Sequence, residues 1–356
     1  MRGEVSLRLM PIRRAIALAS LLLALFGAAI ARAAELTVHF LDVGQGDAIL
    51  IVSPSGKTVL VDAGPPQAAG RLARRLRELV HEPLDLAILT HPHADHVGGM
   101  KRSIEAVGAR LFLDPGASHG SPLYEALLRS LEAWRIPVKI AKAGRTIDLG
   151  GGASLHLLGP LDPPLVGTRS DVNANCVVAR LVFGKTAVYL AGDSELETER
   201  HILASREIIR SDVYKVAHHG SRFSSSAGLL TRVQPGVAVI SAGAHNDYGH
   251  PSEHALSRLA SYGARIYRTD RDGEITVSSD GEAIRVTTGA ARIEQASPKR
   301  PGHRRERHHR LHDEAPGDGE LPNRGRSDGD AQGALEQRPA DRALAAGGPA
   351  IQSAVP

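Results

Sequence analysis

The chain has little of several features that would narrow its class. It contains one cysteine in 356 residues, Cys176, so no intramolecular disulfide can form. After residue 33 no run of about 20 apolar residues occurs, which excludes an integral membrane domain in that part of the sequence. Aromatic residues make up only 3%, but 42% of the residues are hydrophobic, enough to fill the core of a globular enzyme. The net charge of +4 permits an anionic substrate without requiring one.

The two ends of the chain differ in composition from its middle. Arginines precede an apolar run at 15–30, which ends in Ala31-Arg32-Ala33. This pattern predicts a signal peptide over 1–33 and export to the periplasm or the extracellular space, with an uncleaved anchor as the alternative. The segment 291–356 lacks Phe, Tyr and Trp, and we expect a disordered tail there. One globular domain over 34–290 remains.

Short apolar runs alternate with helical stretches throughout this domain. The predicted strands are 36–41, 48–52, 58–61, 86–89, 110–113, 154–158, 177–183, 186–191, 213–216, 237–241, 265–267 and 274–278. The predicted helices are 68–80, 123–134, 195–204, 227–233 and 252–262. Hairpin turns are expected at Asp272-Gly273 and at 279–281. Two series of strands with helices between them predict an α/β fold, a four-layer αββα sandwich.

The strongest chemical signal follows the predicted strand 86–89. Within six positions the chain places His91, His93, Asp95 and His96. Imidazole nitrogens and carboxylate oxygens are preferred ligands of zinc and related divalent ions, and a loop at the end of a strand lets alternate side chains converge. This segment therefore predicts a metal centre.

Other candidates also stand at the ends of predicted strands. Asp62 and Asp193 each end an apolar run. Asp193 would suit a bridge between two ions, and Asp62 could orient a ligand histidine without touching the metal. The pair His218-His219 follows the strand that begins at Val213, and His250 lies in a Gly-His-Pro segment before a helix.

Together these residues resemble the metallo-β-lactamase fold, and within it the nuclease-like domain of the competence protein ComEC/Rec2. The run Val38-His-Phe-Leu-Asp-Val-Gly-Gln-Gly-Asp-Ala48 is similar to the start of that domain, and the likeness extends over about 36–281. The resemblance implies two divalent ions, Zn or Mn. It implies that His91 and His93 bind the first ion, Asp95 and His96 the second, with Asp193 between them. For the remaining histidine we favour His218 over His219, although the spacing does not decide. Asp95 and His250 are the catalytic candidates.

One departure from this family concerns the first ion. The histidine that usually completes its site has no match in 170–176, Ser-Asp-Val-Asn-Ala-Asn-Cys. Asp171 or Asn175 could supply an oxygen ligand instead, and oxygen ligands favour manganese over zinc. Cys176 could supply a thiolate, but a small buried apolar role is the preferred interpretation.

The resemblance implies an exported phosphodiesterase that acts on DNA, single-stranded by expectation, through a metal-bound water. Lys215, Ser221 and Arg222 are expected to contact its phosphates. Two alternatives stay open. The same chemistry could hydrolyse a lactone, a lactam or another small ester, or the chain could be a non-catalytic module that binds DNA or a partner. The oligomeric state is not predicted.

Overall fold

Two β-sheets organise the chain, and the first one contains the N-terminal strands. The computed structural model describes residues 35–116 and 120–289, so the predicted signal peptide and tail lie outside the described residues. The strand order of the first sheet is β15 (Ile284–Thr288), β14 (Ile275–Ser279), β1 (Leu36–Phe40), β2 (Ile49–Val52), β3 (Thr58–Val61), β4 (Leu86–Ile88), β5 (Phe112–Asp114) and β6 (Val138–Ile140). The strands are antiparallel from β15 to β3 and parallel from β3 to β6.

The second sheet has the same division into an antiparallel and a parallel part. Its order is β13 (Arg265–Arg268), β12 (Val237–Ile240), β11 (Val213–Lys215), β10 (Thr186–Leu190), β9 (Ala179–Phe183), β8 (Ala153–Leu157) and β7 (Thr146–Gly150). The strands β10 to β13 are parallel. The parallel parts matter for function, because parallel strands end at the same edge of a sheet.

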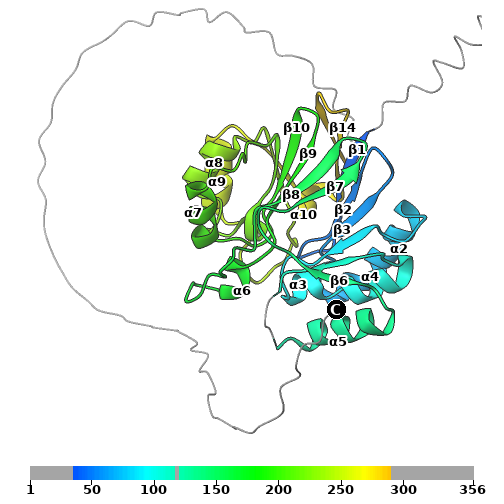
Figure 1. Cartoon of the computed structure of the whole chain (residues 1–356). Coiled ribbons are helices and arrows are strands. Elements are labelled where there is room, and N and C mark those ends of the chain that lie inside the picture. The colour runs from blue at the N-terminus through cyan, green and yellow to red at the C-terminus, as the bar shows by residue number, and fades with distance from the viewer. Residues whose placement is uncertain (1–34, 117–119, 290–356) are drawn as a thin grey trace, which may run out of the picture. The chain divides into compact units, whose positions relative to one another are not determined.

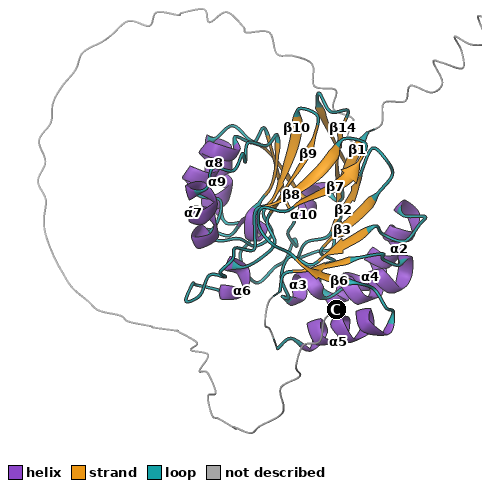
Figure 2. Cartoon of the chain, viewed as in Figure 1, coloured by secondary structure: helices purple, strands orange, loops and turns teal. Residues whose placement is uncertain are grey.

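Helices cover the outer face of each sheet (Figures 1 and 2). The first sheet packs against α2 (Ala69–Leu79), α4 (Met100–Val107) and α5 (Pro122–Ala133), and the second against α7 (Leu196–Ala204), α8 (Ala227–Val233) and α9 (Glu253–Ser261). Shorter helical segments are η1 (Pro66–Ala68), α3 (Ala94–Val97), α6 (Asp171–Ala174), η2 (Ala217–Gly220) and α10 (Thr269–Asp272). A third apolar core lies between the sheets, so the predicted αββα sandwich is confirmed.

The strand sequences explain this layering. In β2, Ile49 and Ile51 belong to the core between the sheets, and Leu50 belongs to the core under the helices. A strand that is buried on both faces reads as a continuous apolar run. Each such side chain contributes about 1.5–3 kcal/mol when it leaves water. In α2, Leu72 and Leu76 lie four residues apart and therefore face the sheet together.

One carboxylate connects β1 and α2 with the start of β14. Glu274, just before β14, accepts hydrogen bonds from His39 of β1 at 3.0 Å and from Arg75 of α2 at 2.8 and 3.1 Å. Burial alone would raise the pKa of Glu274, but these two partners outweigh it and bring that pKa to about 2. The ionised carboxylate therefore ties the helix to the sheet.

The structure corrects one predicted turn and adds strands. The hairpin at Asp272-Gly273 is wrong, because 269–272 form α10 and the chain there crosses from β13 in the second sheet to β14 in the first. The hairpin at 279–281 is confirmed by the pairing of Ser279 with Ile284. The sequence did not predict β6, β7 and β15, which are edge strands of the two sheets. Within the described ranges, no helix is long and apolar enough to cross a membrane.

Candidate metal centre

The predicted residues meet where the parallel strands of both sheets end. Asp62 follows β3, and the segment from Thr90 follows β4. Asp193 follows β10, and His218-His219 follow β11 in the second sheet. The short helix α3 adds Asp95 and His96 to this edge. Side chains far apart in the sequence therefore converge because their strands run in the same direction.

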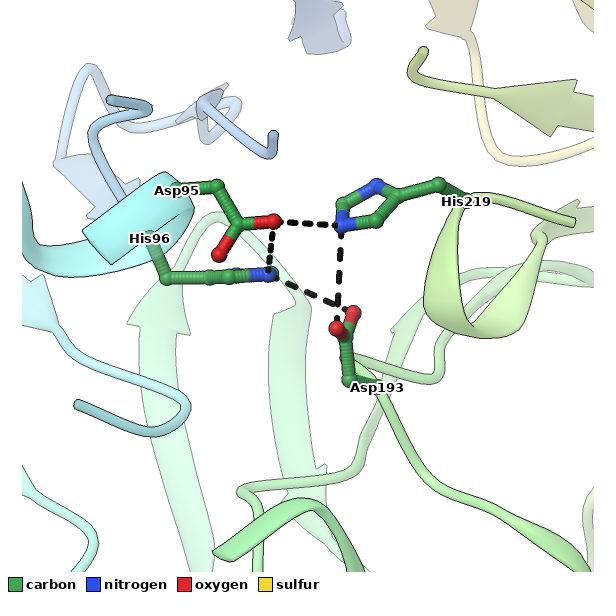
Figure 3. Close-up of side chains that lie close together, drawn as sticks. All are labelled: Asp95, His96, Asp193 and His219. Atoms are coloured by element: carbon green, nitrogen blue, oxygen red, sulfur yellow. Dashed lines mark ion pairs between the residues drawn. The ribbon is translucent and has the colours of Figure 1, made fainter. Parts of the chain in front are cut away.

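Four of these side chains form a cluster that we call the central cluster: Asp95, His96, Asp193 and His219 (Figure 3). One ligand atom from each lies within 4.8 Å of all the others. His219 Nε2 lies 3.2 Å from Asp95 Oδ2 and 3.6 Å from Asp193 Oδ2. His96 Nε2 lies 3.3 Å from Asp193 Oδ1. The two aspartates and two histidines thus surround a common point.

The central cluster fits a divalent cation. His96 Nε2, Asp193 Oδ1 and His219 Nε2 are buried and make no hydrogen bond to any residue that the structure describes. A buried polar atom without a partner costs about 1–3 kcal/mol, so three at one point call for an explanation. Imidazole and carboxylate groups form a donor set that Zn²⁺ and Mn²⁺ both accept.

The charges within the cluster support the same conclusion. Burial alone would raise the pKa of Asp193, but His96 and His219 hold that pKa well below its usual range. Burial alone would lower the pKa of His219, but Asp193 and Asp47 raise it to about 10. Positive charge on the neighbouring histidines thus stabilises the ionised carboxylates. A bound cation would supply this charge in place of the histidine protons.

His91 and His93 lie beside the central cluster. His91 is fully buried, and its Nε2 lies 3.7 Å from Asp193 Oδ2. His91 Nε2 also lies 3.0 Å from His93 Nδ1, a hydrogen bond that occupies both atoms. The structure therefore brings the four residues of the 91–96 motif together with Asp193. The facing ring nitrogens of His91 and His93 are hydrogen-bonded to each other.

Asp62 contacts His96 on the ring nitrogen opposite the central cluster. Its Oδ2 lies 2.8 Å from His96 Nδ1 and 2.7 Å from Thr90 Oγ1, and its Oδ1 accepts the Thr90 N–H at 2.8 Å. Burial raises the pKa of Asp62, and the hydrogen bond to His96 opposes that rise. A carboxylate on the far ring nitrogen fixes the tautomer that leaves Nε2 free for a metal.

A second carboxylate, Asp47, supports His219 and was not predicted. Asp47 Oδ1 lies 3.3 Å from His219 Nδ1, and Asp47 Oδ2 lies 2.8 Å from Lys215 Nζ. Burial alone would raise the pKa of Asp47, but Lys215 and His219 lower it to about 2. The expected phosphate contact by Lys215 is wrong, because this side chain is fully buried in the ion pair. The Gly-Gln-Gly-Asp run at 44–47 was the available signal for Asp47.

His218 has a carboxylate partner of its own, Glu195. His218 Nδ1 lies 3.0 Å from Glu195 Oε1, and its Nε2 lies 3.7 Å from Asp193 Oδ2. Both His218 and His219 have a positive φ, 49° and 53°. Successive residues of a strand point to opposite faces, but this left-handed backbone brings both rings to Asp193. The conformation costs roughly 1–2 kcal/mol per residue, which is typical of strain kept at a functional site.

The segment 170–176 places a different asparagine at the site from the one expected. Asp171 is exposed and bonds to Thr168 and Gly167, and the amide of Asn175 bonds to backbone groups. Cys176 is fully buried in the apolar core of the second sheet, where burial raises its pKa. Asn173 instead lines the cavity of the site, and its Oδ1 is buried without a hydrogen-bond partner among the described residues.

The cavity over the central cluster has a volume of about 860 Å³ and is lined by residues from the first-sheet and the second-sheet parts of the fold. His93, Asp95 and Asp193 lie in its lining together with Arg71 of α2. His250 lies in the opposite half, and its ring centroid is 5.4 Å from that of His218. Burial lowers the pKa of His250, and the charges of His218 and His219 lower it further, to about 4. His250 is therefore neutral near pH 7.

A buried cluster of histidines and aspartates at the open edge of a two-sheet α/β sandwich defines a metal-dependent hydrolase. The family described as the Metallo-beta-lactamase superfamily matches residues 41–245, and the chain belongs to this superfamily.

Several curated proteins are similar to the chain. ComE operon protein 3 of Bacillus subtilis is 29% identical and Recombination protein 2 of Haemophilus influenzae 31%, over 67% and 68% of this chain. The chain spans only about a third of their length, 32% and 28%. Ribonuclease Z of Bradyrhizobium diazoefficiens is 33% identical over 29% of this chain and 36% of its own. Among solved structures, the diiron β-hydroxylase CmlA from Streptomyces venezuelae is 16% identical, with a TM-score of 0.48 over 68% of this chain and 53% of that one.

Proposed function

We propose that the protein is an exported metal-dependent phosphodiesterase that cleaves single-stranded DNA. The observation that carries this proposal is the central cluster, whose buried atoms without a hydrogen bond converge below a cavity that holds an exposed arginine, Arg71. The names of the relatives support the substrate. One relative is named Recombination protein 2 and another Ribonuclease Z, and a ribonuclease cleaves phosphodiesters. Export rests on the pattern of 1–33.

We assign two ions to the site. Asp95, His96 and His219 would bind one, and His91 and His93 the other, with Asp193 between them. Asn173 and His218 would complete the second group, since both line the cavity and no histidine of the usual third motif is present. An oxygen from Asn173 in that group favours Mn²⁺. In this assignment His96 and His218 each bond to a carboxylate, Asp62 and Glu195. His219 Nδ1 lies 3.0 Å from the Ser241 carbonyl oxygen and 3.3 Å from Asp47 Oδ1.

Two ions at such a site lower the pKa of a water and stabilise the charge that develops on the phosphate. The side chains of the chain position this reaction. Asp95 is the more exposed carboxylate of the central cluster, with 28% of its side chain exposed against 2% for Asp193. The cluster holds the pKa of Asp95 well below its usual range, so it stays ionised and accepts a hydrogen bond. His250 Nδ1 is buried without a partner among the described residues and would contact the scissile group.

A small ester, lactone or lactam is the second candidate substrate. One observation favours it, since the wall of the cavity includes an apolar stretch formed by Val43, Pro65, Pro66 and Ala68. Such a wall would hold an acyl group as well as a deoxyribose. Phosphodiester and acyl substrates would use the same metal ions and differ only in what the cavity recognises.

The test is hydrolysis by the full chain of labelled single-stranded DNA, and of a panel of lactones and β-lactams, with EDTA, Mn²⁺ or Zn²⁺. His219→Ala removes a cluster ligand, and His156→Ala is the matched control because His156 lies on β8, away from the cavity lining. We expect metal-dependent DNA cleavage that His219→Ala abolishes and His156→Ala retains. Turnover of the small substrates alone would replace this proposal by an acyl hydrolase. Metal binding without any turnover would favour a binding module.

A further inference from the structure

A second cavity opens beside the metal centre, and the proposed reaction does not use it. Its volume is about 530 Å³, within the range of about 300–1,000 Å³ that is typical of ligand sites. It shares His218, Tyr248 and His250 with the cavity over the metal centre. A polymer that lies at the central cluster and extends past these three residues would therefore enter the second cavity.

The second cavity carries two guanidinium groups on one aromatic ring. Arg169 lies 3.5 Å and Arg222 4.8 Å from the ring centroid of Phe223. Arg169 Nε is also 3.5 Å from Glu195 Oε2, so part of its charge is compensated. Arg222 is exposed and forms no ion pair with a residue that the structure describes. The lining contains one carboxylate, Glu253, against these two cations.

This combination suits the backbone of a nucleic acid. Arginine binds phosphate through several donors in a fixed plane, and a ring beneath it limits the entropy that binding costs. Ser221 also lines the second cavity but is only 2% exposed, so the expected contact with phosphate falls to Arg222.

Tyr248 stands where the two cavities meet and is 70% exposed. Its ring is stacked on His250, with 5.9 Å between ring centroids and 27° between planes. The stack holds the tyrosine in place while most of its surface stays in water. An exposed, oriented aromatic ring beside cationic groups is the usual platform for an unpaired base, because every base offers a face on which a ring can stack.

We propose that the second cavity is a nucleotide subsite for single-stranded DNA, a proposal that rests on the phosphodiesterase function above. Tyr248 stacks on the base next to the scissile phosphate, and Arg222 binds the following phosphate. A base inside a duplex has both faces covered by its neighbours and cannot reach Tyr248. The subsite therefore selects single strands by stacking, with little preference for sequence.

The test measures binding separately from cleavage. The full chain, with EDTA or Mn²⁺, is titrated into fluorescently labelled single-stranded and duplex oligonucleotides and followed by fluorescence anisotropy. Tyr248→Ala should weaken single-strand binding about 5- to 150-fold, and Tyr248→Phe, which keeps the ring, by less than about threefold. Arg222→Ala should lower the slope of log affinity against log salt by about 0.7. Arg265→Ala is the control, because Arg265 also lies over a ring, 5.1 Å from the centroid of Tyr267, but outside both cavities.

The outcomes separate the two proposals. If the wild type cleaves DNA but Tyr248→Ala binds single strands as tightly as the wild type, the subsite is wrong and the phosphodiesterase stands. Equal losses for Tyr248→Ala and Tyr248→Phe, or equal affinity for duplex and single strand, would also overturn the subsite. If the wild type cleaves nothing yet binds single strands through Tyr248, the subsite stands and the phosphodiesterase fails.

Discussion

Replacing Asp62 by asparagine should weaken metal binding with little change in shape. The new amide oxygen can still accept the Thr90 N–H that Asp62 Oδ1 accepts at 2.8 Å. The new NH₂ group then stands where Oδ2 was, 2.8 Å from His96 Nδ1. It donates to Nδ1, so the proton of the ring moves to Nε2, the atom that faces the ion. Asp62 has a φ of 57°, and asparagine tolerates this left-handed backbone well.

Loss of such a carboxylate typically costs about 10- to 100-fold in metal affinity. That factor corresponds to about 1.4–2.7 kcal/mol. Isothermal titration calorimetry with Mn²⁺ on the EDTA-treated chain measures it. The matched control is Asp114→Asn, since Asp114 is 3% exposed at the end of β5 and accepts hydrogen bonds from Tyr124 and Gly116 but from no histidine among the described residues. Asp114→Asn should bind Mn²⁺ as the wild type does. Wild-type affinity in Asp62→Asn would refute the claimed role of Asp62.

Two further predictions concern stability. The folded pKa of Glu274 is about 2 and its ordinary value 4.5, so the stability from this group is complete above pH 4.5 and is lost as the pH falls towards 2. Glu274→Gln should therefore lower the free energy of unfolding by about 1–3 kcal/mol at pH 7. Urea unfolding should show that the difference between variant and wild type shrinks towards pH 2. A difference that does not change with pH would contradict the role given to Glu274. An alanine Cβ at Gly46, where φ is 132°, would collide with the Asp95 carbonyl oxygen, whereas at Gly44 it meets nothing within 4 Å. Thermal unfolding with and without Mn²⁺ measures the effect. Gly46→Ala should lose stability and also the extra stability that Mn²⁺ gives, whereas Gly44→Ala should lose only about 1–2 kcal/mol of stability. Equal behaviour of the two variants would show that the contact between Gly46 and Asp95 is not close.

The sequence predicted the buried parts of the fold better than the exposed ones. Strands such as β2 are apolar on both faces and leave a clear pattern, whereas β6 exposes Val138 and Ile140, 44% and 53%, and its short run has no alternation to detect. The turn at Asp272-Gly273 has hairpin residues but connects two sheets, a difference that only tertiary packing determines.

In the site, too, some residues were predicted from the sequence and others were not. The 91–96 motif and Asp193 were predicted because ligand types recur at strand ends. The pair His218-His219 was ambiguous, because the two residues are neighbours and the spacing does not decide between them. In the structure both lie beyond β11 with a positive φ, and both rings approach Asp193. Asp47 and Glu195 were not predicted, since their roles depend on histidines more than 20 residues away. Asn173 lies between the two residues that were considered instead, and only its unpartnered Oδ1 distinguishes it.

The most direct test of the account is an anomalous difference map from crystals of the chain grown with Mn²⁺. Two peaks are expected beside Asp193. One would lie within coordination distance of Asp95, His96 and His219, and the other of His91 and His93. Two such peaks would establish the dinuclear centre on which the proposed hydrolysis depends. A map without a peak at the central cluster, under conditions that saturate the protein with Mn²⁺, would contradict it.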